Sequence, residues 1–515
     1  MKLDNLQKTF YIFLAVIVSI FIATLLWEKI SLPLNNLGGT KGSLVLKGYN
    51  PANDTIRYIL FITLPLIVYL FFNQKLKKKT IKIKEIIFEK DKKIVNYQPF
   101  LILFSLIFVI LILYEFFSIN FSFSNYRLDH FHDGNFLTPF QNFLLTKKIW
   151  ISSQLIHGGS DIFYPFLMWK FFGAHSIGAS RAFPIFLILL LKLSCVLLSY
   201  QFTKISNLNK YSQILFFTIL TYVLISMSTY TFLGAGYYFS HKDIYIILFL
   251  IFFIELFIDS KFKSLSIFLI CFISTASILL QIDRGAYINF VLIFYFFYSV
   301  IAKKYNESIL IFLSLLLCWI LAINIIGFDE FKSFLENTKV MFLSGDLMLG
   351  LKYPEPFFSI SIDPNGARAT RALLLQVMAG LFVLNYIISN ENKIFSSKKI
   401  LFLFLFLLSI VIFKNALGRS DGSHIRGVHD LPSLIICLFI LNYLLIFIEK
   451  KFSFKKTFYT LSTLFLLFYY INNHNNYKFE NIKNFSINFT NFINLEDKIF
   501  LDQKTKKLIN YYKQI

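Results

Sequence analysis

Long apolar runs alternate with shorter polar connections along most of this chain. A helix that crosses a lipid bilayer needs about 20 mainly apolar residues, and thirteen runs approach that length. They cover residues 9–27, 56–73, 97–119, 182–203, 211–231, 243–258, 265–281, 287–302, 308–327, 372–389, 400–414, 431–448 and 457–471. The pattern predicts an all-α polytopic integral membrane protein with about thirteen transmembrane helices.

Lysine is concentrated in every second connection between these runs. If the N-terminus is cytoplasmic, the lysine-bearing connections all fall on the cytoplasmic side, as the positive-inside rule requires. The longest of them, residues 74–96, holds nine lysines, and it could alternatively bind lipid head groups or nucleic acid. Because the same bias recurs along the chain, membrane topology is the preferred interpretation.

The composition agrees with a membrane protein. Apolar residues make up 56% of the 515 residues, charged residues only 16%, and 65 residues are Phe. A soluble domain could not bury that much apolar surface, so soluble classes are excluded. The formal net charge of +22 would otherwise suggest a nucleic acid partner, but the lysines already serve topology and we expect none. All four cysteines lie within apolar runs, which indicates buried thiols rather than disulfides.

The remaining connections fall on the outer side under this topology. They cover residues 28–55, 120–181, 232–242, 282–286, 328–371, 415–430 and the tail from 472. Every histidine of the chain lies in one of them: His130, His132, His157, His175, His241, His424, His429 and His474. The positive-inside rule makes no use of histidine, so this segregation independently indicates binding or chemistry on the outer face.

The outer connection at 120–181 is much longer than a link between two helices requires, and long loops in compact folds tend to be functional or disordered. Its segments "NFLTPFQNFLLT" and "FYPFLMWKFFGAHSIGASRAF" have apolar residues at helical spacing. We therefore predict that this connection forms amphipathic helices along the membrane surface, with a re-entrant segment as the alternative.

Two groups of titratable residues stand in this connection. They are Asp129, His130, His132 and Asp133 in "LDHFHDGN", and His157 and Asp161 in "IHGGSDIFYP". Partial desolvation raises the pKa of a carboxyl group, so that it can act as a general base. The same carboxylates and imidazoles could bind a divalent cation. For any single one of these residues, a solvated position that only caps a helix is the alternative.

Other outer connections carry basic residues. They include His241, Lys242, Arg284, Arg419 and His424, with Asp283 and Asp421 beside the two arginines. Charges at the bilayer boundary are costly unless they line a site or pair with each other. Because arginine supplies forked donors that match a phosphate, the pattern predicts a cationic pocket for a lipid-linked phosphate. Structural ion pairs, Asp283 with Arg284 and Arg419 with Asp421, are the alternative.

These motifs resemble the membrane-embedded glycosyltransferases of the C fold. In that superfamily an acidic motif opens the first large outer loop, and a helix resembling "FFGAHSIGASR" leads into the next span. The matching residues are Asp129, Asp133, Gly173, Ser176, Ala179 and Arg181, and "GRSDGSH" at 418–424 resembles a late outer-loop motif of some bacterial members. The motif-level match covers about residues 125–185. The chain departs from the family in having two earlier spans and a "DHFHDG" motif instead of adjacent carboxylates.

The resemblance implies an inverting transferase that uses a polyprenyl-phosphate-linked sugar on the periplasmic face of a bacterial inner (plasma) membrane. Its acceptor would be a glycan, a lipid or a protein. Asp133 is the expected base, with Asp129 as second choice and His132, His157 and Asp161 as orienting or metal-adjacent groups. The expected contacts to lipid phosphate or substrate are His241, Lys242, Arg284, Arg419, Asp421 and His424. A divalent cation fits this residue set, but no tight ligand motif specifies a metal or another cofactor.

Two other functions remain open. A lipid-linked oligosaccharide polymerase or ligase would use the same lipid phosphate, and the 328–371 connection, with Arg368 and Arg371, favours it. A transporter or flippase would carry charges inside its spans and Gly/Pro-broken helices near the midplane. The charges here stand at the outer ends of the spans, which favours an enzyme.

The predicted topology divides the chain into three parts. Residues 1–96 form two spans and the basic cytoplasmic connection, residues 97–471 form the transferase-like core, and residues 472–515 form a tail on the periplasmic side.

Overall fold

The computed structural model of the chain describes residues 3–36, 39–76, 98–119, 130–173, 177–206, 208–226, 240–258, 261–359, 364–388, 397–451, 455–473 and 479–493. Within these ranges the fold is entirely helical, and Leu351 and Arg419 form a single isolated parallel bridge. The predicted all-α class is therefore confirmed for the described residues.

The described helices occur in the following order along the chain. Their bounds are α1 Leu3–Trp27, α2 Ser43–Leu46, α3 Ala52–Leu76, α4 Gln98–Phe117, α5 His130–Thr146, α6 Ser160–Phe172, α7 Ile177–Ile205, α8 Lys210–Ser226, the 3₁₀ turn η2 His241–Asp243, α9 Ile244–Glu255, α10 Lys263–Leu280, α11 Ile282–Ile301, α12 Tyr305–Ile326, α13 Phe328–Leu349, α14 Pro364–Ile388, α15 Ser397–Ile412, α16 Lys414–Gly418, α17 Gly422–Gly427, α18 Asp430–Lys451, α19 Lys455–Asn473, α20 Phe479–Lys483 and α21 Phe485–Ile493.

Nine helical stretches among the described residues are long and apolar enough to cross a membrane, as expected of a polytopic membrane protein. Each of the thirteen predicted runs coincides with a helix, but those in α4, α8, α9 and α19 are not among the nine. The 12-residue α9 would reach only about 18 Å against a hydrocarbon core of about 30 Å. The number thirteen therefore stays a prediction.

Outward-facing apolar side chains show where lipid would contact the bundle. On α12, Ile309, Phe312, Leu316 and Ile320 are each about half exposed or more, from 47% to 59%. A continuous apolar face of this kind is rare on a soluble monomer. The opposite extreme is α9, whose residues are nearly all buried, so it forms the centre of the core although it is short.

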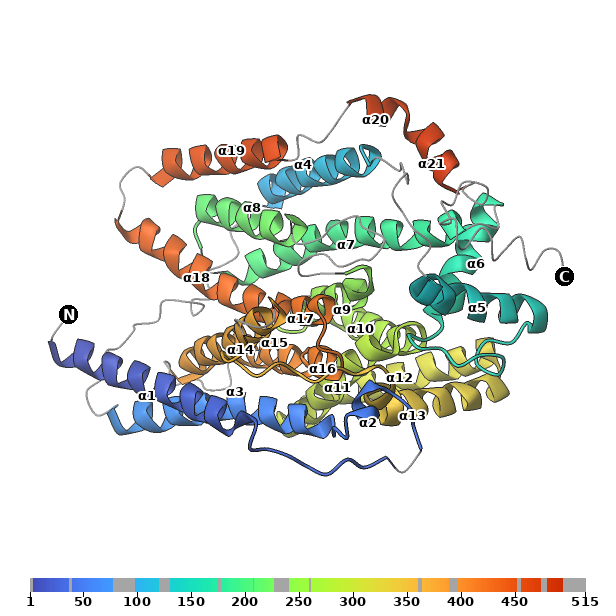
Figure 1. The fold of residues 1–515 in the computed structure, drawn as a ribbon. Coiled ribbons are helices and arrows are strands. Elements are labelled where there is room, and N and C mark those ends of the chain that lie inside the picture. The colour runs from blue at the N-terminus through green and yellow to red at the C-terminus, as the bar shows by residue number, and fades with distance from the viewer. Residues whose placement is uncertain are drawn as a thin grey trace.

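Figure 1 shows the long helices running side by side, with α1 and α3 along the lower edge and α4 and α19 along the upper edge. At one end of this bundle the lysine-bearing connections are tied together. Lys204 lies 3.6 Å from Glu255, and Lys263 lies 2.6 Å from Glu307. We call this the lysine end, and the end with the connections at 157–161, 240–243, 281–284 and 413–430 the histidine end.

The predicted surface helices of the 120–181 connection form α5 and α6, so their helical character is confirmed, while their orientation to a membrane stays a prediction. The 328–371 connection, in contrast, contains a 22-residue helix, α13, that the sequence did not predict. Glu330 of α13 accepts hydrogen bonds from the backbone N–H groups of Ile149 and Trp150, at 3.0 and 2.7 Å. Asn337 of α13 binds both backbone groups of Leu155. The two long connections thus support each other at the histidine end.

Candidate functional site

The segment from His157 to Asp161 is fixed to the corner between α10 and α11. The backbone N–H of Gly159 donates to the carbonyl of Leu279 at 2.8 Å, and the N–H of Ile282 donates to the carbonyl of His157 at 2.8 Å. A Cβ on Gly158 would stand 3.0 Å from the Leu280 carbonyl oxygen. Gly158 and Gly159 therefore allow the close approach of this segment to the end of α10.

Gly158→Ala is expected to destabilise the protein by about 1–3 kcal/mol, because Gly158 has φ +113° in a region that L-residues rarely adopt. The measurement is thermal unfolding of the purified chain in detergent. Gly134→Ala is the matched control, since a Cβ there meets nothing within 4 Å. Equal melting temperatures for the two variants would contradict the steric assignment.

The glycine segment presents a histidine–aspartate pair. His157 Nδ1 and Asp161 Oδ1 are 2.9 Å apart, and the other carboxylate oxygen accepts the backbone N–H of His157 at 3.1 Å. Asp161 is only 1% exposed, whereas the side chain of His157 is 24% exposed. A carboxylate in this position favours the imidazole tautomer with its proton on Nδ1, which makes Nε2 the proton-accepting atom.

Next to this pair lies a charge cluster, the Arg284 cluster, formed by Lys242, Asp243, Asp283 and Arg284. Arg284 Nε donates to Asp243 at 2.8 Å, and its Nη1 and backbone N–H donate to Asp283. The second oxygen of Asp243 accepts the N–H and hydroxyl of Ser240 at 2.7 and 2.8 Å. Asp283 and Arg284 thus form the ion pair that the sequence offered as the structural alternative.

Two residues border the Arg284 cluster with unused polar atoms. His241 and Asp430 are 7% and 5% exposed, and among the described residues His241 Nδ1 and Asp430 Oδ1 have no hydrogen-bond partner. Burial and the charge of Lys242 hold the pKa of His241 well below its usual range, so its imidazole stays neutral. Burial also lowers the pKa of Lys242, although Asp283 opposes that shift.

A second group, the Arg419 cluster, consists of Arg368, Lys414, Arg419, Asp421 and His424. Arg419 Nε donates to Asp421 at 2.8 Å, and His424 Nδ1 lies 2.7 Å from the other oxygen of Asp421. Burial alone would raise the pKa of Asp421, but the hydrogen bonds and charge of His424 outweigh it and lower the pKa. The predicted pairing of Arg419 with Asp421 is therefore present.

Arg368 joins this cluster across a glycine. An added Cβ on Gly422 would stand 2.7 Å from Arg368 Nη1, so the guanidinium lies against the start of α17 and a larger residue at 422 would displace it. Arg368 donates one hydrogen bond, to Asn365 at 2.9 Å. Most guanidinium N–H groups of Arg368 and Arg419 thus have no protein acceptor among the described residues.

Asp346 of α13 links the two clusters. It forms an ion pair with Lys414 and lies within electrostatic range of Tyr287, which also interacts with Asp283 and Arg284. Asp430 interacts with Asp243 and Arg284. Both clusters therefore lie at the histidine end, coupled electrostatically through Asp346 and Tyr287.

Several predicted site residues lie outside what the structure describes. Asp129 falls outside the described ranges, and so does Ser176 of the family motif. His132 and Asp133 belong to the first turn of α5, but their side chains are not described, and neither is that of Arg181. Within the described part of the chain, no group of three or more His, Cys, Asp or Glu residues could hold a metal ion.

Sequence reasoning missed three members of the site. Asp243 follows the selected pair His241 and Lys242 and could have been found as the nearest acid to Arg284. Asp346 stands in the unpredicted helix α13, and Lys414 stands at the end of an apolar run. Their roles depend on contacts between distant segments, which spacing does not reveal.

Comparison of the chain with protein-family models, with curated proteins and with solved structures finds no match.

Proposed function

We propose that this protein is a membrane-embedded glycosyltransferase that moves a sugar from a polyprenyl-phosphate carrier to an acceptor. Its site would face the periplasm of a bacterial inner membrane, with the N-terminus in the cytoplasm and up to thirteen spans. One observation carries the proposal: the Arg284 and Arg419 clusters, drawn from separate connections, both lie at the same end of the long apolar helices. Such a place suits a substrate with an apolar chain and an anionic head group.

The Arg419 cluster is the better site for the phosphate. Among the described residues, Arg419 and Arg368 each donate one side-chain hydrogen bond to a protein acceptor, which leaves planar donor pairs for phosphate oxygens. Arg284, in contrast, already donates to two carboxylates. We therefore assign Arg284 and Lys242 to the local electric field and to holding the site together.

The transfer needs one proton acceptor. The hydroxyl oxygen of the acceptor substrate forms a bond to the anomeric carbon of the sugar. At the same time the bond from that carbon to the phosphate oxygen breaks, and its electron pair stays on the phosphate. Asp133 is our first choice to take the acceptor proton and Asp129 the second, as the C-fold resemblance implies. The His157–Asp161 pair would orient the acceptor hydroxyl, and the cationic groups would stabilise charge on the departing phosphate.

Transfer assays on membranes that contain the full chain test this proposal. We expect sugar transfer from polyprenyl-phosphate donors, and a loss of about 10²–10⁴-fold in Asp133→Asn or Asp129→Asn. Asn135→Ala, in the same turn of α5, should keep its activity. Full activity of both aspartate variants would overturn the assigned bases, and no transfer by the wild-type protein would overturn the enzyme proposal and favour a transporter.

A polymerase or ligase acting on lipid-linked oligosaccharides is the second candidate. The observation that favours it is Arg368, which comes from the start of α14 and lies beside Gly422 in the Arg419 cluster. More cationic donors suit a diphosphate better than a monophosphate. Assays with monophosphate- and diphosphate-linked donors separate the two candidates, because each would accept only one of them.

A further inference from the structure

We infer that the N-terminal helices α1 and α3 position the Arg419 cluster, through an ion network with a buried centre, Asp54 and Arg57, that holds residues 350–353. This inference rests on the proposed role of the Arg419 cluster in phosphate binding. The network, called here the Arg57 network, consists of Glu28, Tyr49, Asp54, Arg57 and Lys352. Its residues lie outside both clusters of the candidate site. Through them, the two N-terminal spans α1 and α3 would support that site.

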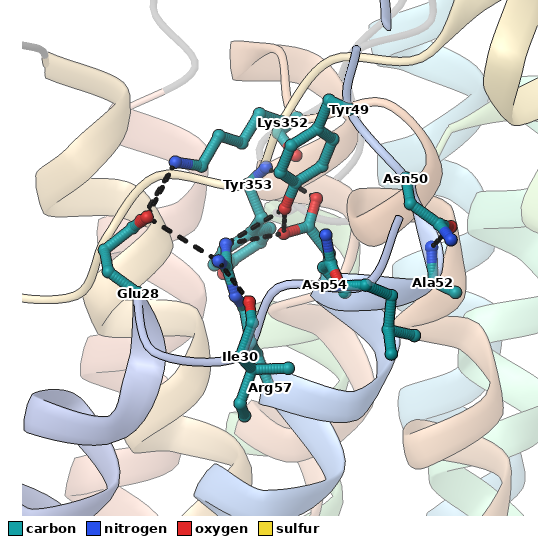
Figure 2. Close-up of polar contacts among 12 residues, drawn as sticks. Glu28, Ile30, Tyr49, Asn50, Ala52, Asp54, Arg57, Lys352 and Tyr353 are labelled. Atoms are coloured by element: carbon teal, nitrogen blue, oxygen red, sulfur yellow. Dashed lines mark hydrogen bonds and ion pairs between the residues drawn. The ribbon is translucent and has the colours of Figure 1, made fainter. Parts of the chain in front are cut away.

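Figure 2 shows Tyr49, Asp54 and Arg57 pointing toward one another at the start of α3. The Tyr49 hydroxyl donates to Asp54 Oδ1 at 2.5 Å, and Arg57 Nη1 donates to the Tyr49 oxygen at 2.9 Å. Asp54 is 0% exposed and Arg57 is 2% exposed. Burial and the charge of Asp54 raise the pKa of Tyr49, so its hydroxyl keeps the proton that it donates.

The network holds the segment that follows α13. The second oxygen of Asp54 accepts the backbone N–H of Tyr353 at 2.9 Å, and Lys352 pairs with Glu28 at 2.9 Å. The Tyr353 side chain is fully buried and donates to the carbonyl of Ala369 on α14 at 2.9 Å. The Asp54 carboxylate therefore binds both the Tyr49 hydroxyl and the backbone of the segment at 350–353.

The same segment touches the Arg419 cluster directly. Leu351 forms the backbone bridge to Arg419, and the carbonyl of Leu351 accepts the hydroxyl of Ser420 at 3.1 Å. A Cβ on Gly350 would stand 2.8 Å from the Gly418 carbonyl oxygen, so the two backbones are in close contact. Ala369, whose carbonyl accepts the hydrogen bond from the Tyr353 hydroxyl, is next to Arg368 in the chain. A shift of residues 350–353 would therefore displace both phosphate-binding arginines.

Asp54→Asn tests this inference because it keeps the size of the side chain while removing its charge and one acceptor. The experiment titrates farnesyl monophosphate into the full chain in phosphatidylcholine nanodiscs, with farnesol as the probe that lacks phosphate. We expect affinity for the phosphate probe to fall by about 3- to 30-fold, with no change for farnesol. In transfer assays KM for the donor should rise while kcat stays within about twofold of the wild-type value.

Glu307→Gln is the matched control. Glu307 accepts a tyrosine hydroxyl, from Tyr295 at 2.7 Å, and pairs with Lys263, but it lies at the lysine end. The Glu307→Gln variant should have a lower melting temperature, as Asp54→Asn does, but unchanged affinity for farnesyl monophosphate. Equal loss of affinity in both variants would show a general folding effect and overturn the inference.

Two further variants separate this inference from the proposed function. Arg419→Gln should abolish binding of the phosphate probe, and Tyr49→Phe should weaken it less than Asp54→Asn does. If the wild-type chain does not distinguish farnesyl monophosphate from farnesol, the proposed phosphate site is wrong. If it does, and Asp54→Asn binds as the wild-type chain does, the phosphate site stands and the positioning role is wrong.

Discussion

Arg284→Gln is expected to cost about 3–5 kcal/mol of folding free energy, because removal of one partner of a buried ion group leaves the others unpaired. Arg284 is 7% exposed and donates to both Asp243 and Asp283. The substitution therefore removes the arginine charge that pairs with the carboxylates of Asp243 and Asp283. Lys242 is the remaining cation of the cluster. Transfer activity should be lost with the folded protein.

The measurement is thermal or denaturant unfolding of the full chain in detergent, with the yield of monodisperse protein as a second readout. Arg419→Gln is the matched control, because Arg419 is 34% exposed and its hydrogen-bonded ion-pair partner is Asp421. It should cost about 1 kcal/mol or less. Equal destabilisation by the two substitutions would show that the Arg284 cluster is not a buried ion group.

Neutralising Arg284 together with its two carboxylate partners offers a further check. The triple variant Arg284→Gln, Asp243→Asn and Asp283→Asn removes the unpaired charges together with their partner. Joint replacement of the members of a buried ion group is often close to neutral. Because Lys242 keeps its charge, the triple variant should recover only part of the stability that the single variant loses.

The apolar pattern predicted the helices well because bilayer crossing depends on length and hydropathy, which are local properties of a sequence. It failed for α13, where residues such as Asp329, Glu330, Lys332 and Glu336 interrupt the apolar pattern. Two of its polar side chains, Glu330 and Asn337, are buried and hold the backbone of residues 149–155, whereas Asp329, Lys332 and Glu336 are exposed. Tertiary contacts therefore decided what the local pattern could not.

The candidate site was predicted only in part, because a sequence shows pairs that are close along the chain but not contacts between distant segments. His157 with Asp161, Asp283 with Arg284, and Arg419 with Asp421 are pairs within four residues of each other, and short spacing makes such pairs visible in a sequence. The contribution of Asp346 and the contact of Arg368 with Gly422 join segments about 50 to 75 residues apart. The Arg57 network joins Glu28 to Lys352, which are 324 positions apart, and its Asp54 binds the backbone of Tyr353, 299 positions away. No spacing rule finds those contacts.

Asp161→Asn is expected to reduce the rate of sugar transfer by about 10²-fold, which is the order of loss when a reacting group is misplaced by about 1 Å. Asp161 accepts two N–H groups of His157, one from the backbone and one from the ring. Asparagine offers one oxygen and one NH₂ group, so one donor of His157 must face another donor. Either the imidazole changes its tautomer or the glycine segment moves.

Asp421→Asn makes the same chemical change in the second histidine–aspartate pair, where Asp421 holds His424 and Arg419. Because that pair belongs to the proposed phosphate site, Asp421→Asn should mainly raise KM for the donor, whereas Asp161→Asn should mainly lower kcat. The difference separates a role in orienting the reacting hydroxyl from a role in binding. If Asp161→Asn loses activity only in proportion to the amount of folded protein, His157 and Asp161 merely support the corner of α10 and α11, and the reacting groups must be sought in the first turn of α5.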